Sequence, residues 1–125
     1  MTRINALHNC SNPYQGQYKK VLCVCSAGLL RSPTTAIVLQ RTYNYNTRAC
    51  GVHDYALIQF DDVLGTWADE IVCVEQSIAN NIPDQFKNKV ITLNIPDRYE
   101  YMNPELQEII KEQYDNALRN SRRTD

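Results

Sequence analysis

The stretch Val21–Thr35, VLCVCSAGLLRSPTT, decides how the rest of the chain is interpreted. It begins with a continuous apolar run, which predicts a buried parallel strand over 19–25. Ser32 and Pro33 then suit the cap and first turn of a helix that runs to about residue 43. A strand, a short loop and a helix N-terminus place backbone N–H groups around one small space. Such a space suits a tetrahedral oxyanion such as phosphate.

The rest of the chain alternates apolar strand-like runs with helical patterns, which predicts one parallel α/β domain. We expect an α/β fold of three layers, with a four-stranded parallel sheet in the order 2-1-3-4 and helices on both faces. Ligands bind at the carboxyl ends of the strands in such sheets, where the loop after the first strand lies. The predicted strands cover 19–25, 47–50, 69–74 and 89–95, and the predicted helices cover 33–43, 58–67, 75–81 and 103–118.

Residues 19–120 form the predicted domain, preceded by a polar N-terminal arm over 1–18 and followed by a polar tail over 121–125. The chain has 125 residues and a net charge of -1, so its composition favours neither a nucleic-acid nor a membrane surface. No apolar run reaches the roughly 18 residues that span a bilayer, and no secretory signal is expected. Five cysteines, three of them in strand-like runs, suit a reducing compartment, so we expect a cytoplasmic protein.

The chemistry of the opening stretch centres on Cys25, which ends the first predicted strand. A helix N-terminus and a neighbouring cation both favour the thiolate form of cysteine, so Cys25 is the candidate nucleophile. Arg31 presents a planar fork that matches two phosphate oxygens, and the Ser32 hydroxyl can donate a hydrogen bond to the sulfur. Backbone N–H groups of the intervening loop would bind the remaining oxygens during phosphoryl transfer. That loop consists of Ser26, Ala27, Gly28, Leu29 and Leu30.

Cleavage of a phosphate ester also needs a proton donor for the leaving group. Asp97 follows the fourth predicted strand and should lie at the same sheet edge as Cys25, so it is the preferred general acid. Glu100 is the competing candidate. Aromatic and imidazole side chains that follow strands at this edge are candidates for the rim of the substrate pocket; they are His53, Tyr55, Tyr99 and Tyr101.

Together these segments resemble the low-molecular-weight protein tyrosine phosphatases, and most closely a small bacterial and phage branch of that family. Cys25 is followed by five residues and then by Arg31–Thr34, RSPT, as in the phosphate loop of that branch. Trp67–Ile71, WADEI, matches its strand start, and Ile95–Leu106, IPDRYEYMNPEL, matches its late acid loop. The three segments occur in the family's order over about 19–118.

The resemblance implies a protein tyrosine phosphatase that works through a phosphocysteine intermediate, with no metal and no cofactor. By matching position, Cys25 is the nucleophile, Arg31 the phosphate binder, Ser32 the thiolate stabiliser and Asp97 the general acid. The implied partners are a phosphotyrosine protein or small aryl phosphate, with a phosphate or sulfate anion able to occupy the loop.

The chain departs from the family at several positions. Gly28 stands where an asparagine often braces the loop, and Leu30 stands where many eukaryotic members carry a second cysteine. Cys50 is unusual at its position, and either Cys50 or Cys23 could protect the nucleophile through a disulfide.

Two other functions remain open. An arsenate reductase uses a similar loop but needs further cysteines to relay a disulfide; only Cys10 and Cys50 are free enough for that role, and no closely spaced downstream pair exists. A non-catalytic module that binds phosphate or a phosphoprotein would need no general acid, so the combination of Cys25, Arg31 and Asp97 favours the enzyme.

Overall fold

A central sheet organises the computed structural model, which describes residues 9–10, 18–25, 31–52, 58–96, 100 and 102–123. Its strands lie in the order β1-β3-β2-β4-β5, and the last four pair in parallel. In chain order these four have the arrangement 2-1-3-4, which confirms the predicted α/β sheet. The elements are β1 Asn9–Cys10, β2 Lys20–Cys25, α2 Arg31–Tyr43, β3 Asn46–Gly51, α3 Asp62–Trp67, β4 Glu70–Cys73, α4 Gln76–Ala79, the 3-10 helix η2 Asp84–Lys89, β5 Val90–Thr92 and α5 Pro104–Arg123.

Strand β2 lies in the middle of the sheet because its apolar side chains can be buried on both faces. Residues 21–24 have no exposed surface. Val24 aligns with Cys50 of β3 on one side and with Cys73 of β4 on the other. The carboxyl end of β2 therefore lies between the carboxyl ends of β3 and β4. In parallel α/β folds, ligands bind at this edge of the sheet.

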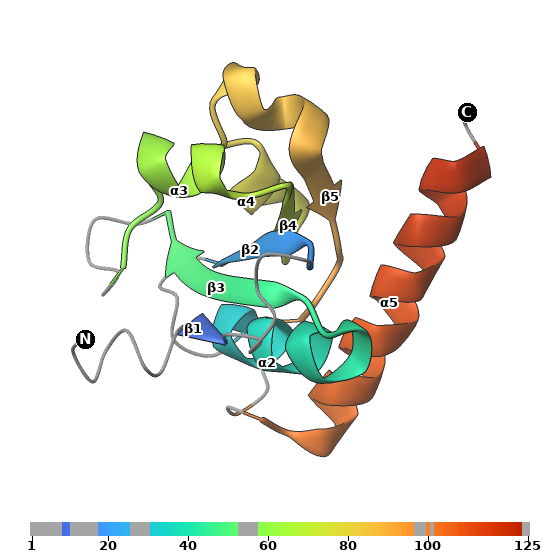
Figure 1. Cartoon of the computed structure of the whole chain (residues 1–125). Helices are drawn as coiled ribbons and strands as arrows, with labels where there is room; N and C mark the ends of the chain where they lie inside the picture. Colours follow the sequence, from blue (N-terminus) through green and yellow to red (C-terminus); the bar gives the residue numbers. More distant parts are fainter. Residues whose placement is uncertain are drawn as a thin grey trace.

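Helices cover both faces of this sheet (Figure 1). α2 and α5 lie on one face, and α3, α4 and η2 lie on the other. The α2 layer is fastened to β3 by the Thr47 hydroxyl, which donates to the Ala36 carbonyl at 2.8 Å. The sheet and the helices on its two faces form the three layers that were predicted.

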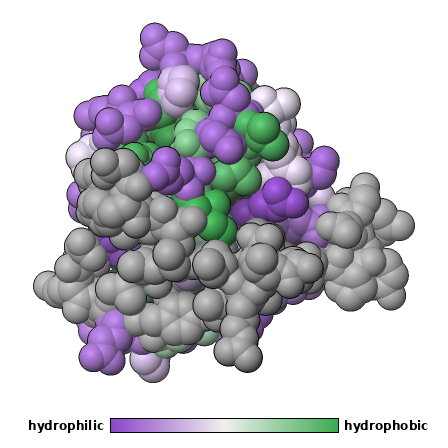
Figure 2. All heavy atoms as spheres, turned by 90° about the vertical axis from the view of Figure 1, so that its left-hand side faces the viewer, coloured by the Kyte–Doolittle hydropathy of each residue, from purple (hydrophilic) through white to green (hydrophobic). Residues whose placement is uncertain are grey.

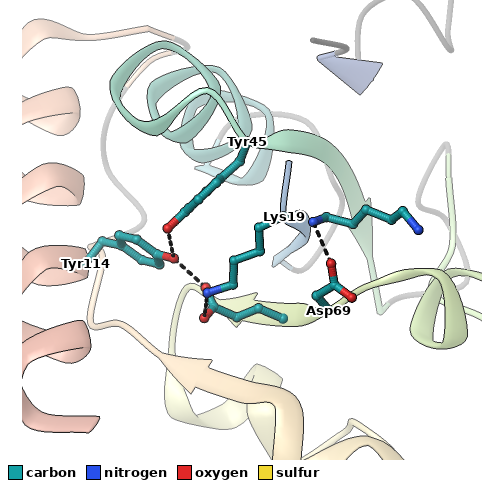
Figure 3. A network of polar contacts seen from close by, with 6 residues as sticks. Lys19, Tyr45, Asp69 and Tyr114 are labelled. Carbon is teal, nitrogen blue, oxygen red and sulfur yellow. Dashed lines mark hydrogen bonds and ion pairs between the residues drawn. The ribbon is translucent and has the colours of Figure 1, made fainter. Parts of the chain in front are cut away.

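A polar network connects α5 to the amino-terminal ends of the strands, at the sheet edge opposite the carboxyl end of β2 (Figure 3). Tyr114 is fully buried, and its hydroxyl donates to Glu70 Oε1 at 2.5 Å. Lys19 Nζ donates to Glu70 Oε2 at 2.6 Å, so this nearly buried carboxylate has partners on both oxygens. The Tyr114 hydroxyl also lies 3.4 Å from the Tyr45 hydroxyl, and Figure 3 shows the two side chains pointing toward each other.

Helix α3 begins later than predicted, at Asp62 instead of Ile58. The Asp61 side chain accepts a hydrogen bond from Leu64 N–H at 2.8 Å, which is the geometry of a helix N-cap. The preceding residues are drawn into the sheet edge, because Gln59 forms a bridge with Gly51. The apolar periodicity over 58–67 predicted the helix but not this start.

Other boundaries also differ from the predicted ones. Asn9–Cys10, inside the predicted arm, pairs antiparallel with β3 and adds a fifth strand to the sheet. η2 was not predicted, and α5 continues through Arg123, past the start of the predicted tail at Ser121.

The surface on the side of α3 mixes hydrophobic and hydrophilic side chains (Figure 2). Val63 is 74% exposed, and it is the one large hydrophobic side chain so exposed among the described residues. Beneath this surface, a Cβ added to Gly65 would lie 2.7 Å from the Phe86 ring. Glycine at this position therefore allows α3 to approach η2 closely. Among the described helices, none combines the length and apolar character needed to cross a bilayer.

Candidate active site

Cys25 and the first turn of α2 meet at the carboxyl end of the central strand. The Cys25 side chain is almost buried, with 3% of the residue exposed. Its thiol donates a hydrogen bond to Ser32 Oγ, and the two atoms are 3.1 Å apart. Pro33 occupies the first turn of α2, where a missing backbone N–H costs nothing. The local sequence thus places a thiol beside a helix N-terminus, as predicted.

The Ser32 hydroxyl lies between the thiol and β3. It accepts from Cys25 and donates to the Cys50 carbonyl at 3.2 Å. A hydroxyl proton can rotate to suit its partners. When Cys25 loses its proton, the Ser32 hydroxyl can turn to donate to the sulfur, which is the role that the sequence predicts for it.

Arg31 joins three strand ends at this edge. Its guanidinium is 3% exposed, and Nη1 donates to the Ile95 carbonyl, beyond β5, at 3.1 Å. Nη2 lies 3.0 Å from Glu75 Oε1, just beyond β4. Arg31 itself begins α2, after β2. The two contacts orient the guanidinium at the carboxyl edge of the sheet, close to Cys25 in the chain.

Glu75 is a further candidate site residue, which was not predicted from the sequence. It follows the buried strand β4, which borders β2, so its place at this edge follows from the strand order. An acidic residue directly after an apolar strand was the available signal. Its side chain is 38% exposed and belongs to the N-cap of α4, although it makes no side-chain cap hydrogen bond.

Strand alternation places Cys25 and Cys50 on opposite faces of the sheet. Cys25 shares its face with Val21, which aligns with Thr47, and the Thr47 hydroxyl contacts α2. Cys50 aligns with Val24 and therefore faces the α3 layer. A disulfide needs Cβ atoms about 3.5–4.5 Å apart, so Cys50 is not positioned to bridge Cys25.

The other buried cysteines are also poorly placed for redox exchange with Cys25. Cys23 shares its face, but alternate residues on one strand lie roughly 6.6 Å apart, which is too far for the Cβ atoms of a disulfide. Burial raises the pKa of the Cys73 thiol to about 12, despite the opposing charge of Lys87. Burial, followed by the charge of Cys25, also raises the pKa of Cys50. Neither thiol is activated for nucleophilic attack.

The structure thus brings together Cys25, Arg31 and Ser32 among the predicted site residues. Glu100 is described and exposed, and its carbonyl accepts from Asn103 N–H at 3.1 Å. The remaining predicted residues lie outside the described part of the chain; they are Ser26, Ala27, Gly28, Leu29, Leu30, His53, Tyr55, Asp97, Tyr99 and Tyr101.

Described residues that border two of these ranges contact the site. Val52 N–H donates to the Cys25 carbonyl at 3.1 Å, immediately before 53–57. Ile95 accepts from Arg31, two residues before Asp97. Within the described ranges, no group of three or more His, Cys, Asp or Glu side chains could hold a metal ion.

Comparison with known proteins identifies the class of fold. No protein-family model and no curated protein matches the sequence. Solved structures do match, and the chain has the fold of the low-molecular-weight protein tyrosine phosphatases.

Three solved structures show the range of the match. The tyrosine phosphatase Wzb from Escherichia coli, in complex with phosphate, is 17% identical with a TM-score of 0.66, over 82% of this chain and 99% of that one. Vibrio vulnificus Wzb, in complex with benzylphosphonate, is 19% identical with a TM-score of 0.60, over 86% and 99%. The YwlE arginine phosphatase from Geobacillus stearothermophilus is 16% identical with a TM-score of 0.60, over 85% and 94%.

Proposed function

We propose that this chain is a cysteine-dependent phosphomonoesterase of the low-molecular-weight type, with phosphotyrosine as its substrate group. The observation that carries the proposal is the cluster at the end of β2. Cys25 Sγ lies 3.1 Å from Ser32 Oγ, and the adjacent Arg31 is buried and oriented by contacts from two other strand ends. A thiol, a hydroxyl and a guanidinium at a helix N-terminus form an anion site with a nucleophile in it.

The proposed reaction has two steps. The Cys25 thiolate attacks phosphorus, the ester P–O bond breaks, and Asp97 gives its proton to the leaving oxygen. A phosphocysteine and a free phenol result. Asp97, now ionised, takes a proton from water as the water oxygen attacks phosphorus. The S–P bond then breaks, releasing phosphate and restoring the Cys25 thiolate.

Arg31 and the loop N–H groups transfer no protons; they stabilise the negative charge of the phosphoryl group. The transferred phosphoryl group carries its charge on three equatorial oxygens, so fixed donors around them stabilise the transition state. Arg31 suits this role because a planar guanidinium can bind two oxygens at once. The phosphate, sulphate and benzylphosphonate in the solved structures of similar fold support an oxyanion as the ligand.

The two alternatives receive less support. An arsenate reductase needs a cysteine that can reach Cys25. Cys50 faces the other layer, and Cys23 is too distant along the strand. Cys10 aligns with Thr47, whereas Cys25 aligns with Gly51 at the other end of β3. A binding module needs no thiol at the anion site. We also propose a cytoplasmic location, which the four buried cysteines, all present as thiols, support.

A substrate panel without added metal tests the proposed function. The panel contains p-nitrophenyl phosphate, phosphotyrosine, phosphoserine and phosphoarginine peptides, and arsenate with a thiol reductant. We expect hydrolysis of the aryl phosphate and the phosphotyrosine peptide. Preference for phosphoarginine would move the substrate class toward that of the similar YwlE. Arsenate reduction without ester hydrolysis would refute the proposal.

Two variants assign the nucleophile. Cys25→Ser should still bind inorganic phosphate but should turn over no substrate and form no phosphoenzyme in a rapid-quench experiment. Cys73→Ala is the matched control, because Cys73 is equally buried but faces the other layer. It should retain turnover. Hydrolysis by the Cys25→Ser protein would exclude the proposed mechanism.

A further inference from the structure

The Arg31 guanidinium is held by the carbonyl of Ile95, a residue that follows strand β5. Backbone pairing with β4 continues beyond the end of β5, because Leu93 N–H donates to the Cys73 carbonyl at 2.8 Å. Ile95 N–H likewise donates to the Val74 carbonyl at 2.9 Å. The Ile95 carbonyl then accepts from Arg31 Nη1 at 3.1 Å. The orientation of this arginine therefore depends on where the backbone after β5 lies.

The Gln113 side chain, on α5, binds the same backbone from the side away from β4. Its Nε2 donates to the Asn94 carbonyl at 2.7 Å, and its Oε1 accepts from Asn94 N–H at 2.6 Å. β5 is an edge strand of the sheet, and alternate residues of an edge strand turn their N–H and C=O groups away from the neighbouring strand. One amide side chain thus gives Asn94 the donor and the acceptor that a further strand would give.

The Asn94 carbonyl and the Ile95 N–H belong to one planar peptide unit. Gln113 binds this unit on one side and the Val74 carbonyl binds it on the other, so the unit cannot rotate without breaking a hydrogen bond. Ile95 precedes Pro96, and a residue before proline is restricted to extended backbone conformations. Fixing the peptide unit before Ile95 therefore also fixes the direction of the Ile95 carbonyl, which is the group that binds Arg31.

We propose that Gln113 is a positioning residue for Arg31: it fixes the Asn94–Ile95 peptide unit and thereby orients the guanidinium for an oxyanion. The inference rests on the proposed phosphatase function, in which Arg31 binds the phosphoryl oxygens. A planar guanidinium binds two oxygens only in a defined orientation, so a loosened Ile95 carbonyl should weaken phosphate binding. Asn94 is exposed, so water can replace both bonds in a Gln113 variant, and the fold should persist.

Removal of the Gln113 amide is the first test. Gln113→Leu keeps a similar side-chain volume but has neither donor nor acceptor. The inhibition constant of inorganic phosphate should rise about three- to tenfold, the value of one lost hydrogen bond, and kcat/KM for p-nitrophenyl phosphate should fall by a similar factor. The loss is partial because Glu75 still contacts Arg31. Gln107→Leu is the matched control, since Gln107 also lies on α5 but donates through Nε2 to the Met102 carbonyl. It should leave phosphate inhibition unchanged.

A second variant uses pH to restore the missing donor. Gln113→Glu keeps an acceptor for Asn94 N–H, but the ionised carboxylate has no proton to donate to the Asn94 carbonyl. A protonated glutamic acid has both a donor and an acceptor. The phosphate inhibition constant of Gln113→Glu should therefore exceed that of the wild type at pH 7 and approach it as the pH falls toward about 4.3, the ordinary pKa of glutamate. Comparison with the wild type at each pH removes the effect of the ionisation of phosphate itself.

A purely structural role for Gln113 predicts different results. Lower stability of Gln113→Leu in urea with an unchanged phosphate inhibition constant would overturn the inference, and so would a deficit in Gln113→Glu that does not change with pH. If the variants do not fold, hydrogen exchange of the wild type decides the question. The Asn94 amide should be protected although the residue is exposed, and exchange at the rate of a free amide would refute the contact. A wild type that hydrolyses no ester would refute the proposed function itself. An active wild type whose Gln113→Leu variant binds phosphate equally well would refute the role of Gln113 alone.

Discussion

The Arg31 guanidinium and the Glu75 carboxylate lie 3.0 Å apart, although Arg31 is almost buried and the Glu75 side chain is 38% exposed. The carboxylate therefore orients the cation from the solvent side, while the Ile95 carbonyl holds it from within. An incoming phosphate would meet an arginine that is already oriented, next to a negative charge that opposes its entry.

Charge and orientation at Glu75 can be separated by two substitutions. Glu75→Gln keeps an acceptor for Arg31 but removes the negative charge, so inorganic phosphate should inhibit about two- to fivefold more strongly, as expected for a partly screened charge. Glu75→Ala removes the acceptor as well and should bind phosphate less tightly than Glu75→Gln. Inhibition constants at low and high salt measure both effects. Weaker inhibition in Glu75→Gln would mean that charge pairing outweighs repulsion.

Ser32→Ala should make Cys25 less reactive without displacing it. The thiolate loses a hydrogen-bond donor, and a hydrogen bond to a charged group contributes about 1.5–3 kcal/mol. We therefore expect about 10- to 100-fold slower alkylation of Cys25 by iodoacetamide at neutral pH. Mass spectrometry of the labelled peptide gives the rate. Ser32→Thr, which keeps the hydroxyl, is the control. Equal rates in all three proteins would remove Ser32 from its proposed role.

Cys50 should not contribute to recovery from oxidation, because it faces the α3 layer while Cys25 faces the α2 layer. After brief exposure to hydrogen peroxide and then dithiothreitol, Cys50→Ala should regain the same fraction of activity as the wild type. A Cys25–Cys50 disulfide found by mass spectrometry, or a loss of recovery in the variant, would contradict this register argument.

Folding stability should fall at alkaline pH because of Tyr114. Burial and the hydrogen bond to Glu70 raise its pKa above the ordinary value of about 10. Above that pH the unfolded chain releases the phenolic proton while the folded chain keeps it, so the unfolded state binds fewer protons. The free energy of unfolding then decreases with pH, by up to about 1.4 kcal/mol per pH unit for this group.

Urea unfolding between pH 7 and about 11 checks this prediction. Tyr114→Phe should be less stable at neutral pH, by about 1–3 kcal/mol, because Glu70 loses a donor. Its stability should then decline less steeply above about pH 10 than that of the wild type. The raised pKa values of Cys50 and Cys73 add a decline of the same sign in both proteins. Parallel curves would show that Tyr114 does not cause the slope.

The sheet was predictable because each of its longer strands is indicated by a short stretch of sequence. Apolar runs such as 21–24 predict buried strands, and alternation with helices predicts the parallel order. β1 was not predictable, because two residues of a polar segment carry no periodic pattern. η2 has a polar sequence with only Phe86 buried, so it too lacks a signal.

The site was predictable only where chemistry is concentrated in one motif. Cys25, Arg31 and Ser32 lie close together in the sequence, and the Cys25 thiol donates to Ser32 Oγ at 3.1 Å. Glu75 contacts Arg31 across 44 residues of sequence, and the Thr34 hydroxyl accepts from Met102 N–H across 68. A threonine in a helix gives no indication of a hydrogen bond to a backbone amide so far along the chain. Such contacts depend on the packed structure and not on local propensity.

The polar network of Lys19, Glu70 and Tyr114 lies at the opposite end of the sheet from Cys25. β2 alone separates them by roughly 16 Å, at about 3.3 Å per residue. Substitutions at sites this distant usually have additive effects on stability. Stabilising substitutions at the amino-terminal end should therefore leave the Cys25 end unaffected, also in a Cys25→Ser protein, which we expect to bind phosphate without turnover. The resulting protein would be a robust reagent for capturing phosphorylated ligands from mixtures.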